Sequence, residues 1–349
     1  MKLSHASTGG PSTGPAINRI GRFHIIRELG RGTVGSVYLG YDPIIDRSVA
    51  IKTFNARLTP KEKKQYEQQF INEARAAGRL SHPNIVTIFD ALNENDCTYI
   101  AMEYLEGREL SKIMGHGNPP FTPDEVASIV WKIADALDYA HKNGVVHRDI
   151  KPANIFMNGN NQPKVVDFGI ARAPNRMPDQ SAQVDQPYTL FRNNLLGTPN
   201  YMSPEQAMGK PVDLRTDIYS LGAVMYEMLT GGKPFKSSDT TQLLQLIAYK
   251  TPEAPHAIDN GIPIMLSHIV MKAMSKRPEK RYQHAEDMAF DIKRYLAAEK
   301  RSRQRVRKEI PILERHEPTT AAPYSRQVLW MGCFATIAVL AIVGIKFLQ

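Results

Sequence analysis

The chain is poor in cysteine, with Cys97 and Cys333 as the two examples among 349 residues. They lie far apart, and the second sits inside an apolar run, so the sequence indicates neither a disulfide framework nor a cysteine metal cluster. Residues 1–18 have hardly any apolar side chains and are rich in Ser, Thr, Gly and Pro. Such a segment cannot offset the entropy lost on ordering, and no apolar stretch follows Lys2, so we expect residues 1–22 to be a disordered leader and not a secretory signal.

Most of the chain also lacks surplus charge, although the formal net charge is +9 at pH 7. Residues 300–308 contain six Lys and Arg and no acid, so removing them leaves +3 for the remainder. The basic character therefore belongs to one short segment, and we expect no nucleic-acid partner. The hydrophobic content of 42% is ample for a globular core of enzyme size.

Two polar motifs follow one another between residues 145 and 169. Residues 147–154 read HRDIKPAN, and residues 167–169 read DFG. Short apolar stretches, VV at 145–146 and PKVV at 163–166, precede them and are predicted to be strands that bring Asp149 and Asp167 to one place. Catalytic groups collect on loops that rigid elements hold in position, so this pair of motifs indicates an active site.

These motifs resemble the catalytic loop and the magnesium-binding motif of protein kinases. A glycine loop, LGRGTVGSV at 29–37, and the sequence VAIK at 49–52 fit the same family. The glycine spacing also occurs in dinucleotide-binding folds, where the glycines open a helix and an acid follows about twenty residues later. That alternative is disfavoured because Val37 begins a β-branched and aromatic stretch, and residues 49–54 offer a lysine in place of an acid.

The resemblance implies an α+β, two-lobed protein kinase fold with a small β-rich lobe, a larger helical lobe and the nucleotide between them. It implies ATP and Mg²⁺, with Mn²⁺ as an alternative metal. Asp149 and Lys151 would be catalytic, and Asn154 and Asp167 would hold the metal. The residues that the resemblance assigns to nucleotide binding are Leu29, Gly30, Gly32, Gly35, Val37, Ala50, Lys52, Glu73, Met102, Glu103 and Leu105.

Several local patterns predict the elements around these residues. A helix is expected after Pro60, and strands are expected at 85–89 and 98–102. The resemblance places Glu73 on this helix and pairs it with Lys52. Thr122 begins a capping box with proline at the first helical position, and Gly144 ends that helix. The buried stripe of the helix is expected to consist of Val126, Ile129, Val130, Ile133 and Leu137.

Two further contacts are expected in the larger lobe. Asp217 begins an apolar helix over 217–229, where an aspartate most often caps the helix. The resemblance gives it a second role, which is to bond the backbone of the catalytic loop. Glu205 stands in an SPE sequence where the family usually has APE, and the resemblance pairs it with Arg281.

Lys151 and the sequence GTPNY at 197–201 resemble the Ser/Thr-specific branch of the family. The resemblance places Thr198 in the platform for protein substrates with Ser or Thr acceptors. Arg148 is expected to pair with a phosphate on the activation segment, for which Thr189 and Ser181 are the candidate autophosphorylation sites. Transfer between two molecules in a homodimer is expected, because one active site cannot easily reach its own loop.

Residues 328–345 are uncharged and almost wholly apolar, which predicts one transmembrane helix over 328–346. A buried core helix could look similar but would rarely run so long without a polar face. The expected domains are a kinase domain at 23–296 and a basic juxtamembrane linker at 297–327. The basic side would face the cytoplasm, which places the chain in the cytoplasmic (inner) membrane with a cytoplasmic kinase domain. The pattern as a whole is similar to bacterial eukaryotic-like (Hanks-type) Ser/Thr kinases with one transmembrane helix.

Two other functions are considered. A pseudokinase scaffold would bind nucleotide without catalysis, and its usual mark is a lost lysine or aspartate, whereas Lys52, Asp149 and Asp167 are all present. A small-molecule kinase of related fold would lack the peptide platform at 197–205, which this sequence contains.

Overall fold

The computed structural model describes residues 19–32, 35–54, 60–94, 97–115, 119–159, 161–168 and 199–309. The chain divides into a first compact unit at residues 1–297 and a second at 298–349. The predicted sites Thr198, Thr189 and Ser181 and the apolar run at 328–346 lie outside the described residues. Across the described ranges, every helix is too short or too polar to cross a bilayer.

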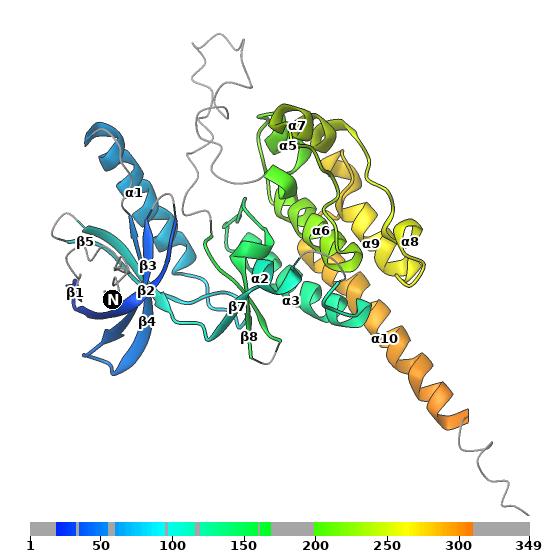
Figure 1. Cartoon of the computed structure of the whole chain (residues 1–349), viewed down its shortest axis with the longest axis horizontal. Helices are drawn as coiled ribbons and strands as arrows, with labels where there is room; N and C mark the ends of the chain where they lie inside the picture. The colour runs from blue at the N-terminus through cyan, green and yellow to red at the C-terminus, as the bar shows by residue number, and fades with distance from the viewer. Residues whose placement is uncertain are drawn as a thin grey trace, which may run out of the picture. The chain divides into compact units, whose positions relative to one another are not determined.

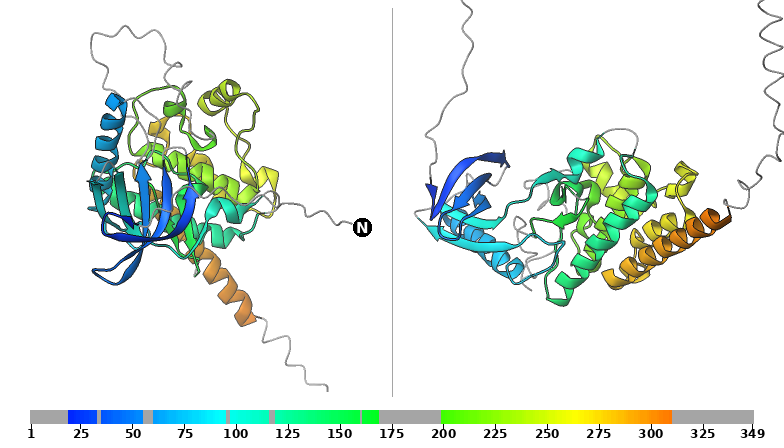
Figure 2. Two further views of the ribbon diagram at one scale, coloured as in Figure 1. Left: turned by 60° about the vertical axis from the view of Figure 1, so that its left-hand side comes forward. Right: turned by 90° about the horizontal axis from the view of Figure 1, so that it is seen from below.

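The N-terminal lobe is built on a six-stranded antiparallel sheet in the order β1-β2-β3-β4-β6-β5, with helix α1 beside β5 and β6 (Figures 1 and 2). Side chains alternate between the two faces of a strand, so residues of β4 divide into two sets. Val49 and Ile51 are buried in one cluster, whereas Ala50 and Phe54 belong to clusters on the other face. Lys52 shares this second face by the same alternation. The elements of this lobe are β1 (Arg19–Ile20), β2 (Phe23–Arg31), β3 (Ser36–Asp42), β4 (Arg47–Phe54), α1 (Pro60–Ala77), β5 (Ile88–Glu94) and β6 (Cys97–Glu103).

The C-terminal lobe is mainly helical, with a large apolar core around helices α3 and α6 (Figure 1). Thr122 forms the predicted capping box with Glu125, and Gly144 follows the helix end with φ +74°. The predicted buried stripe of α3 is confirmed, with all five of its side chains at 2% exposure or less. The helices are α2 (Leu110–Met114), α3 (Pro123–Lys142), α5 (Pro204–Ala207), α6 (Arg215–Thr230), α7 (Thr240–Tyr249), α8 (Pro255–Ile258), α9 (Ile264–Ala273) and α10 (Ala285–Glu309), with 3₁₀ turns η2 (Pro199–Tyr201) and η3 (Pro278–Lys280).

A small three-stranded sheet in the order β7-β8-β9 flanks the two motifs. Strand β8 begins where the catalytic loop ends, and β9 ends two residues before Asp167. Each motif is therefore anchored at one end by a short strand of the same sheet. The elements are β7 (Gly107–Glu109), η1 (Pro152–Asn154), β8 (Ile155–Asn158) and β9 (Pro163–Val165).

Two sequence predictions about strands are wrong. Val145 and Val146 have no strand assignment; the Val145 N–H donates to Ala140 O at 2.9 Å and so completes the turn after α3. The strand predicted at 85–89 begins at Ile88, because Ile85 forms a parallel bridge with Val165 instead of joining the N-terminal sheet. In both places a long-range or turn partner takes the hydrogen bonds that a strand would need. The basic segment 300–308, expected to be a linker, is helical as part of α10.

Candidate active site

The catalytic-loop motif folds into a compact cluster around the Asp149 carboxylate. Lys151 Nζ lies 2.7 Å from Asp149 Oδ2, and Asn154 Nδ2 donates to the same oxygen at 3.1 Å. Asn154 Nδ2 also donates to the backbone carbonyl of Asp149 at 2.8 Å. Asn154 is held by the 3₁₀ turn η1 and Lys151 precedes it, so the irregular loop brings three polar side chains together that a helix or strand would separate.

The buried carboxylate of Asp217 holds the backbone of this loop. It accepts hydrogen bonds from the N–H groups of His147 and Arg148 at 2.8 and 2.7 Å, and His141 Nε2 lies 2.8 Å from it. Arg148 has φ +64°, an unfavourable conformation for a residue other than glycine. Such a conformation costs about 1–3 kcal/mol and persists only where the surrounding contacts hold it. The role that the resemblance gave Asp217 is confirmed. The capping role is not, because Asp213 Oδ1 accepts the Arg215 N–H where α6 starts.

Asp167 lies beside the lysine of the VAIK sequence. Lys52 Nζ is 2.8 Å from Asp167 Oδ1, so residues of β4 and of the DFG motif form an ion pair. Burial opposes the negative charge, but the attraction of Lys52, assisted by His147 and Lys151, outweighs it and holds the pKa of Asp167 below its usual value. Asp167 has φ +61°, so its backbone too is in a conformation that non-glycine residues rarely adopt.

His147 and Phe168 connect the two motifs. The rings of His147 and Phe168 are 4.7 Å apart, and both side chains are buried. His147 Nε2 is 3.0 Å from the carbonyl of Val166. A side chain of one motif thus bonds the backbone of the residue that precedes the carboxylate of the other.

Asn154 and Asp167 have the donor types that Mg²⁺ prefers, an amide oxygen and an ionised carboxylate oxygen. The Asn154 side-chain nitrogen donates both of its hydrogen bonds to Asp149. The side-chain oxygen of Asn154 lies on the other side of the planar amide and could bind a metal. Within the described residues no group of three or more His, Cys, Asp or Glu side chains gathers as a metal cluster. Two protein ligands still fit Mg²⁺, which usually keeps waters and binds substrate phosphates.

An apolar cluster brings together four of the side chains predicted to bind the nucleotide. Ala50 and Met102 are buried there, and Val37 and Leu105 pack against them. The same cluster contains Val86, Ile88 and Val166, which the sequence analysis did not assign to the site. Their apolar character was visible in the sequence, but no local pattern indicated that they would face Ala50.

The glycine loop joins β2 and β3, which pair at Gly30 and Val37. The Gly32 N–H donates to the carbonyl of Gly35 at 2.8 Å, and residues 33–34 between them lie outside the described ranges. Leu29 is on β2 and 37% exposed. Glu73 lies on α1, and its side chain is outside the described part of the structure, so its predicted pairing with Lys52 stays a prediction.

The predicted pair of Glu205 and Arg281 is confirmed in the C-terminal lobe. Arg281 donates from Nη1 to Glu205 Oε1 and from Nη2 to Oε2, each at 2.7 Å, and both side chains are buried. Burial would raise the pKa of Glu205, but the two hydrogen bonds and the charge of Arg281 lower it. This pair fixes the end of the segment that carries the predicted peptide platform.

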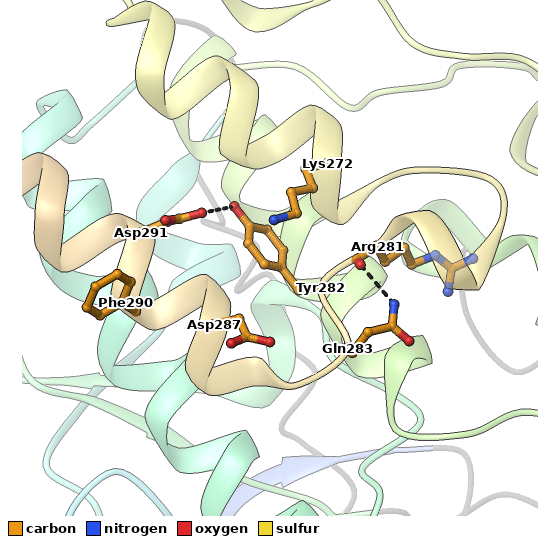
Figure 3. A pocket seen from close by; sticks show the side chains of 7 residues that line it. All are labelled: Lys272, Arg281, Tyr282, Gln283, Asp287, Phe290 and Asp291. Atoms are coloured by element: carbon orange, nitrogen blue, oxygen red, sulfur yellow. Dashed lines mark hydrogen bonds between the residues drawn. The ribbon is translucent and has the colours of Figure 1, made fainter.

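A hollow near the start of α10 contains no residue of the predicted site (Figure 3). The polar groups around it engage one another: Tyr282 Oη donates to Asp291 Oδ2 at 3.0 Å, Lys272 Nζ lies 3.9 Å from the centre of the Tyr282 ring, and Gln283 Nε2 donates to the Arg281 carbonyl at 2.9 Å. We assign no ligand to it.

The sequence profile described as "Protein kinase domain" matches residues 23–315. The chain is 38% identical over 311 residues to serine/threonine-protein kinase PrkC of Bacillus subtilis, covering 86% of this chain and 46% of that protein. It is 38% identical over 277 residues to PknB of Mycobacterium tuberculosis, covering 78% and 42% of the two chains, and 40% identical over 271 residues to Pkn1 of Myxococcus xanthus, covering 76% and 37%. The chain therefore spans less than half the length of each of these curated relatives.

The solved kinase domain of M. tuberculosis PknI is similar in structure, with a TM-score of 0.59, 26% identity and coverage of 79% of this chain and 96% of that one. A double mutant of the same domain has a TM-score of 0.62 at 24% identity, and the alignment covers 81% of this chain and 100% of that one. At this identity the similarity supports only the fold. The predicted two-lobed fold is confirmed.

Proposed function

Because this chain belongs to the protein kinase family, we propose that it transfers the γ-phosphate of ATP to serine or threonine hydroxyls of proteins, itself included. The observation that supports this most is the grouping of Asp149, Lys151 and Asn154 within 2.7–3.1 Å. A second ion pair, between Lys52 and Asp167, supplies the complementary charges that phosphoryl transfer requires.

Phosphoryl transfer asks a protein chiefly to position groups and to neutralise charge. Asp149 accepts the proton of the attacking hydroxyl and orients its oxygen. Lys151 neutralises charge on the transferred phosphate, and Lys52 holds the phosphates of the nucleotide. Asn154 and Asp167 would hold Mg²⁺, which when bound supplies further charge neutralisation across the phosphates.

The base of the nucleotide would lie against the cluster of Val37, Ala50, Met102 and Leu105, and the backbone of the hinge at Glu103 and Leu105 would bond its edge. The glycine loop, with Leu29, Gly30, Gly32 and Gly35, would cover the phosphates, since glycine lets backbone approach closely. Glu73 would fix Lys52, and Thr198 would contribute to the platform for protein substrates.

The test is phosphate incorporation by the full chain with ATP and Mg²⁺. Asp149→Asn removes the proton acceptor at constant shape, and Lys52→Met removes a phosphate contact, so each should reduce incorporation at least about 100-fold. Lys112→Met, which breaks a mostly exposed ion pair with Glu109, serves as a matched control and should leave incorporation unchanged. Undiminished incorporation in either of the first two variants would contradict the assigned roles.

The alternative is a pseudokinase scaffold that binds nucleotide without catalysis. The presence of both carboxylates and both lysines in bonded geometry favours the enzyme. Nucleotide binding by the parent chain without any phosphate transfer to itself or to a protein substrate would favour the scaffold instead.

We further propose the organisation that the sequence indicates: a leader at 1–22, a kinase domain at 23–296, a basic juxtamembrane linker at 297–327 and a membrane anchor at 328–346. The chain would signal from the cytoplasmic membrane with its kinase domain in the cytoplasm. Autophosphorylation would occur between two copies, on Thr189 or Ser181. The leader, the membrane anchor and the two phosphorylation sites rest on the sequence, because residues 1–18, 181, 189 and 328–346 lie outside the described ranges.

A further inference from the structure

Lys164, which the proposed mechanism does not use, forms an ion pair with the hinge. It lies on β9, three residues before Asp167, and its Nζ is 2.7 Å from Glu103 Oε2. The two side chains are 16% and 30% exposed, so the pair is largely withdrawn from solvent. Lys164 Nζ also lies 3.4 Å from the carbonyl oxygen of Ile85. Ile85 belongs to the segment 84–87, which lies between β9 and Glu103.

The segment 84–87 is bonded to β9 on one side. The Val165 N–H donates to Asn84 O at 2.8 Å, and the Val86 N–H donates to Val165 O at 3.0 Å. The Asn84 side chain donates to the Pro163 carbonyl at 2.7 Å and is buried. Residues 84–86 are thus bonded to β9, the strand that leads into Asp167.

The same segment is bonded to the hinge on its other side. The Glu103 N–H donates to Thr87 O at 2.8 Å, and the Thr87 N–H lies 3.3 Å from Glu103 Oε2. The Glu103 carboxylate therefore receives donors from both Thr87 and Lys164. The ion pair spans the segment and connects three neighbouring stretches of chain: β9, residues 84–87 and the hinge at Glu103.

These three stretches of chain contribute four members of the apolar cluster proposed to contact the base. Val86 comes from the middle segment, Val166 follows β9, and Met102 and Leu105 flank Glu103. We propose that Lys164 is a positioning residue that, through Glu103, holds the hinge and the approach to Asp167 in register for nucleotide binding. This inference deepens the proposed function and rests on its nucleotide site.

The physical reason is that a largely buried charge depends on its partner. Removing the Lys164 ammonium leaves the part-buried Glu103 carboxylate without its charged partner, so we expect the carboxylate to turn toward water and release the hinge. The pair between Lys112 and Glu109 has a similar separation of 2.8 Å but a lysine that is 66% exposed, and breaking it should have little effect.

The experiment uses the full chain and measures ADP affinity, kcat and the KM for ATP. Lys164→Met and Glu103→Gln should each weaken ADP binding and raise the KM about three- to tenfold, with kcat changed by less than about twofold. The double variant should resemble either single variant, because both remove one interaction. Lys164→Arg should restore most of the affinity, and Lys112→Met should behave as the parent.

Amide hydrogen exchange of the nucleotide-free chain gives a second, independent readout. Lys164→Met should accelerate exchange at the Thr87 and Glu103 N–H groups, and not at helix α3. Unchanged exchange there, or effects of the two single variants that multiply in the double variant, would overturn the inference. A parent chain that binds no ADP would refute the proposed nucleotide site. The exchange measurement would still show whether the ion pair between Lys164 and Glu103 holds the Thr87 and Glu103 N–H groups in place.

Discussion

Asp217→Asn tests how the catalytic loop is held in its strained conformation. The Asp217 side chain is fully buried and receives the N–H groups of His147 and Arg148 and the His141 ring nitrogen, all within 2.8 Å. Asparagine has nearly the same shape but one accepting oxygen, and its NH₂ group would face a donor. The change therefore removes the charge and at least one hydrogen bond without leaving a cavity.

The expected loss follows from those contacts. A hydrogen bond to a charged group contributes about 1.5–3 kcal/mol, and a buried donor left without an acceptor costs about 1–3 kcal/mol. Because these two terms describe partly the same event, we expect a net loss of about 3 kcal/mol. If the fold absorbs the loss, the melting temperature should fall by about 6–12 °C. If the loop relaxes instead, Arg148 leaves its φ of +64°, and the competent loop becomes about 100-fold less populated.

The assay combines thermal unfolding with kcat for phosphate transfer by the full chain. Asp213→Asn is the control, because Asp213 also accepts a backbone N–H near the start of α6 but is 50% exposed, and it should cost less than about 1 kcal/mol. The reasoning is refuted if Asp217→Asn matches Asp213→Asn in both melting temperature and kcat.

Three further outcomes are expected. Arg281→Met should destabilise the fold by about 3–5 kcal/mol in chemical unfolding, since it leaves the Glu205 carboxylate buried and unpaired, whereas a loss below about 1 kcal/mol would contradict this. Burial lowers the pKa of Lys276 to about 8, below its usual 10.5, so the charged form destabilises the folded state below pH 8. Between pH 8 and 10.5 the unfolded chain holds this proton more tightly than the folded chain, so the free energy of unfolding should rise by about 1–2 kcal/mol. Lys276→Met should remove that rise, which urea unfolding across this pH range will measure. Deleting 322–349 should move the chain from the membrane to the soluble fraction, because about eighteen apolar residues at 1.5 Å each nearly span a bilayer core; extraction of the full chain by carbonate would argue against the anchor.

The sequence by itself was sufficient where neighbouring residues decide the structure. The capping box at Thr122, the helix end at Gly144 and the apolar stripe of α3 depend on spacings of a few residues, and all three are present. The catalytic-loop and DFG motifs could be recognised for the same reason, because each is a short run of adjacent residues. Lys151 and Asn154 accordingly lie beside Asp149, as the compact motif suggested.

The tertiary structure decided every feature that depends on segments distant in the sequence. Asp217 could have capped its own helix, and only the approach of the catalytic loop, about seventy residues earlier, made its carboxylate the acceptor for His147 and Arg148. The sequence predicted that Ile85 begins a strand of the N-terminal sheet, but in the structure Ile85 forms a parallel bridge with Val165. Lys164 and Glu103 are 61 positions apart, and neither residue's neighbours indicate the other. Local patterns record propensity and periodicity, whereas such pairings depend on which surfaces the packed core brings together.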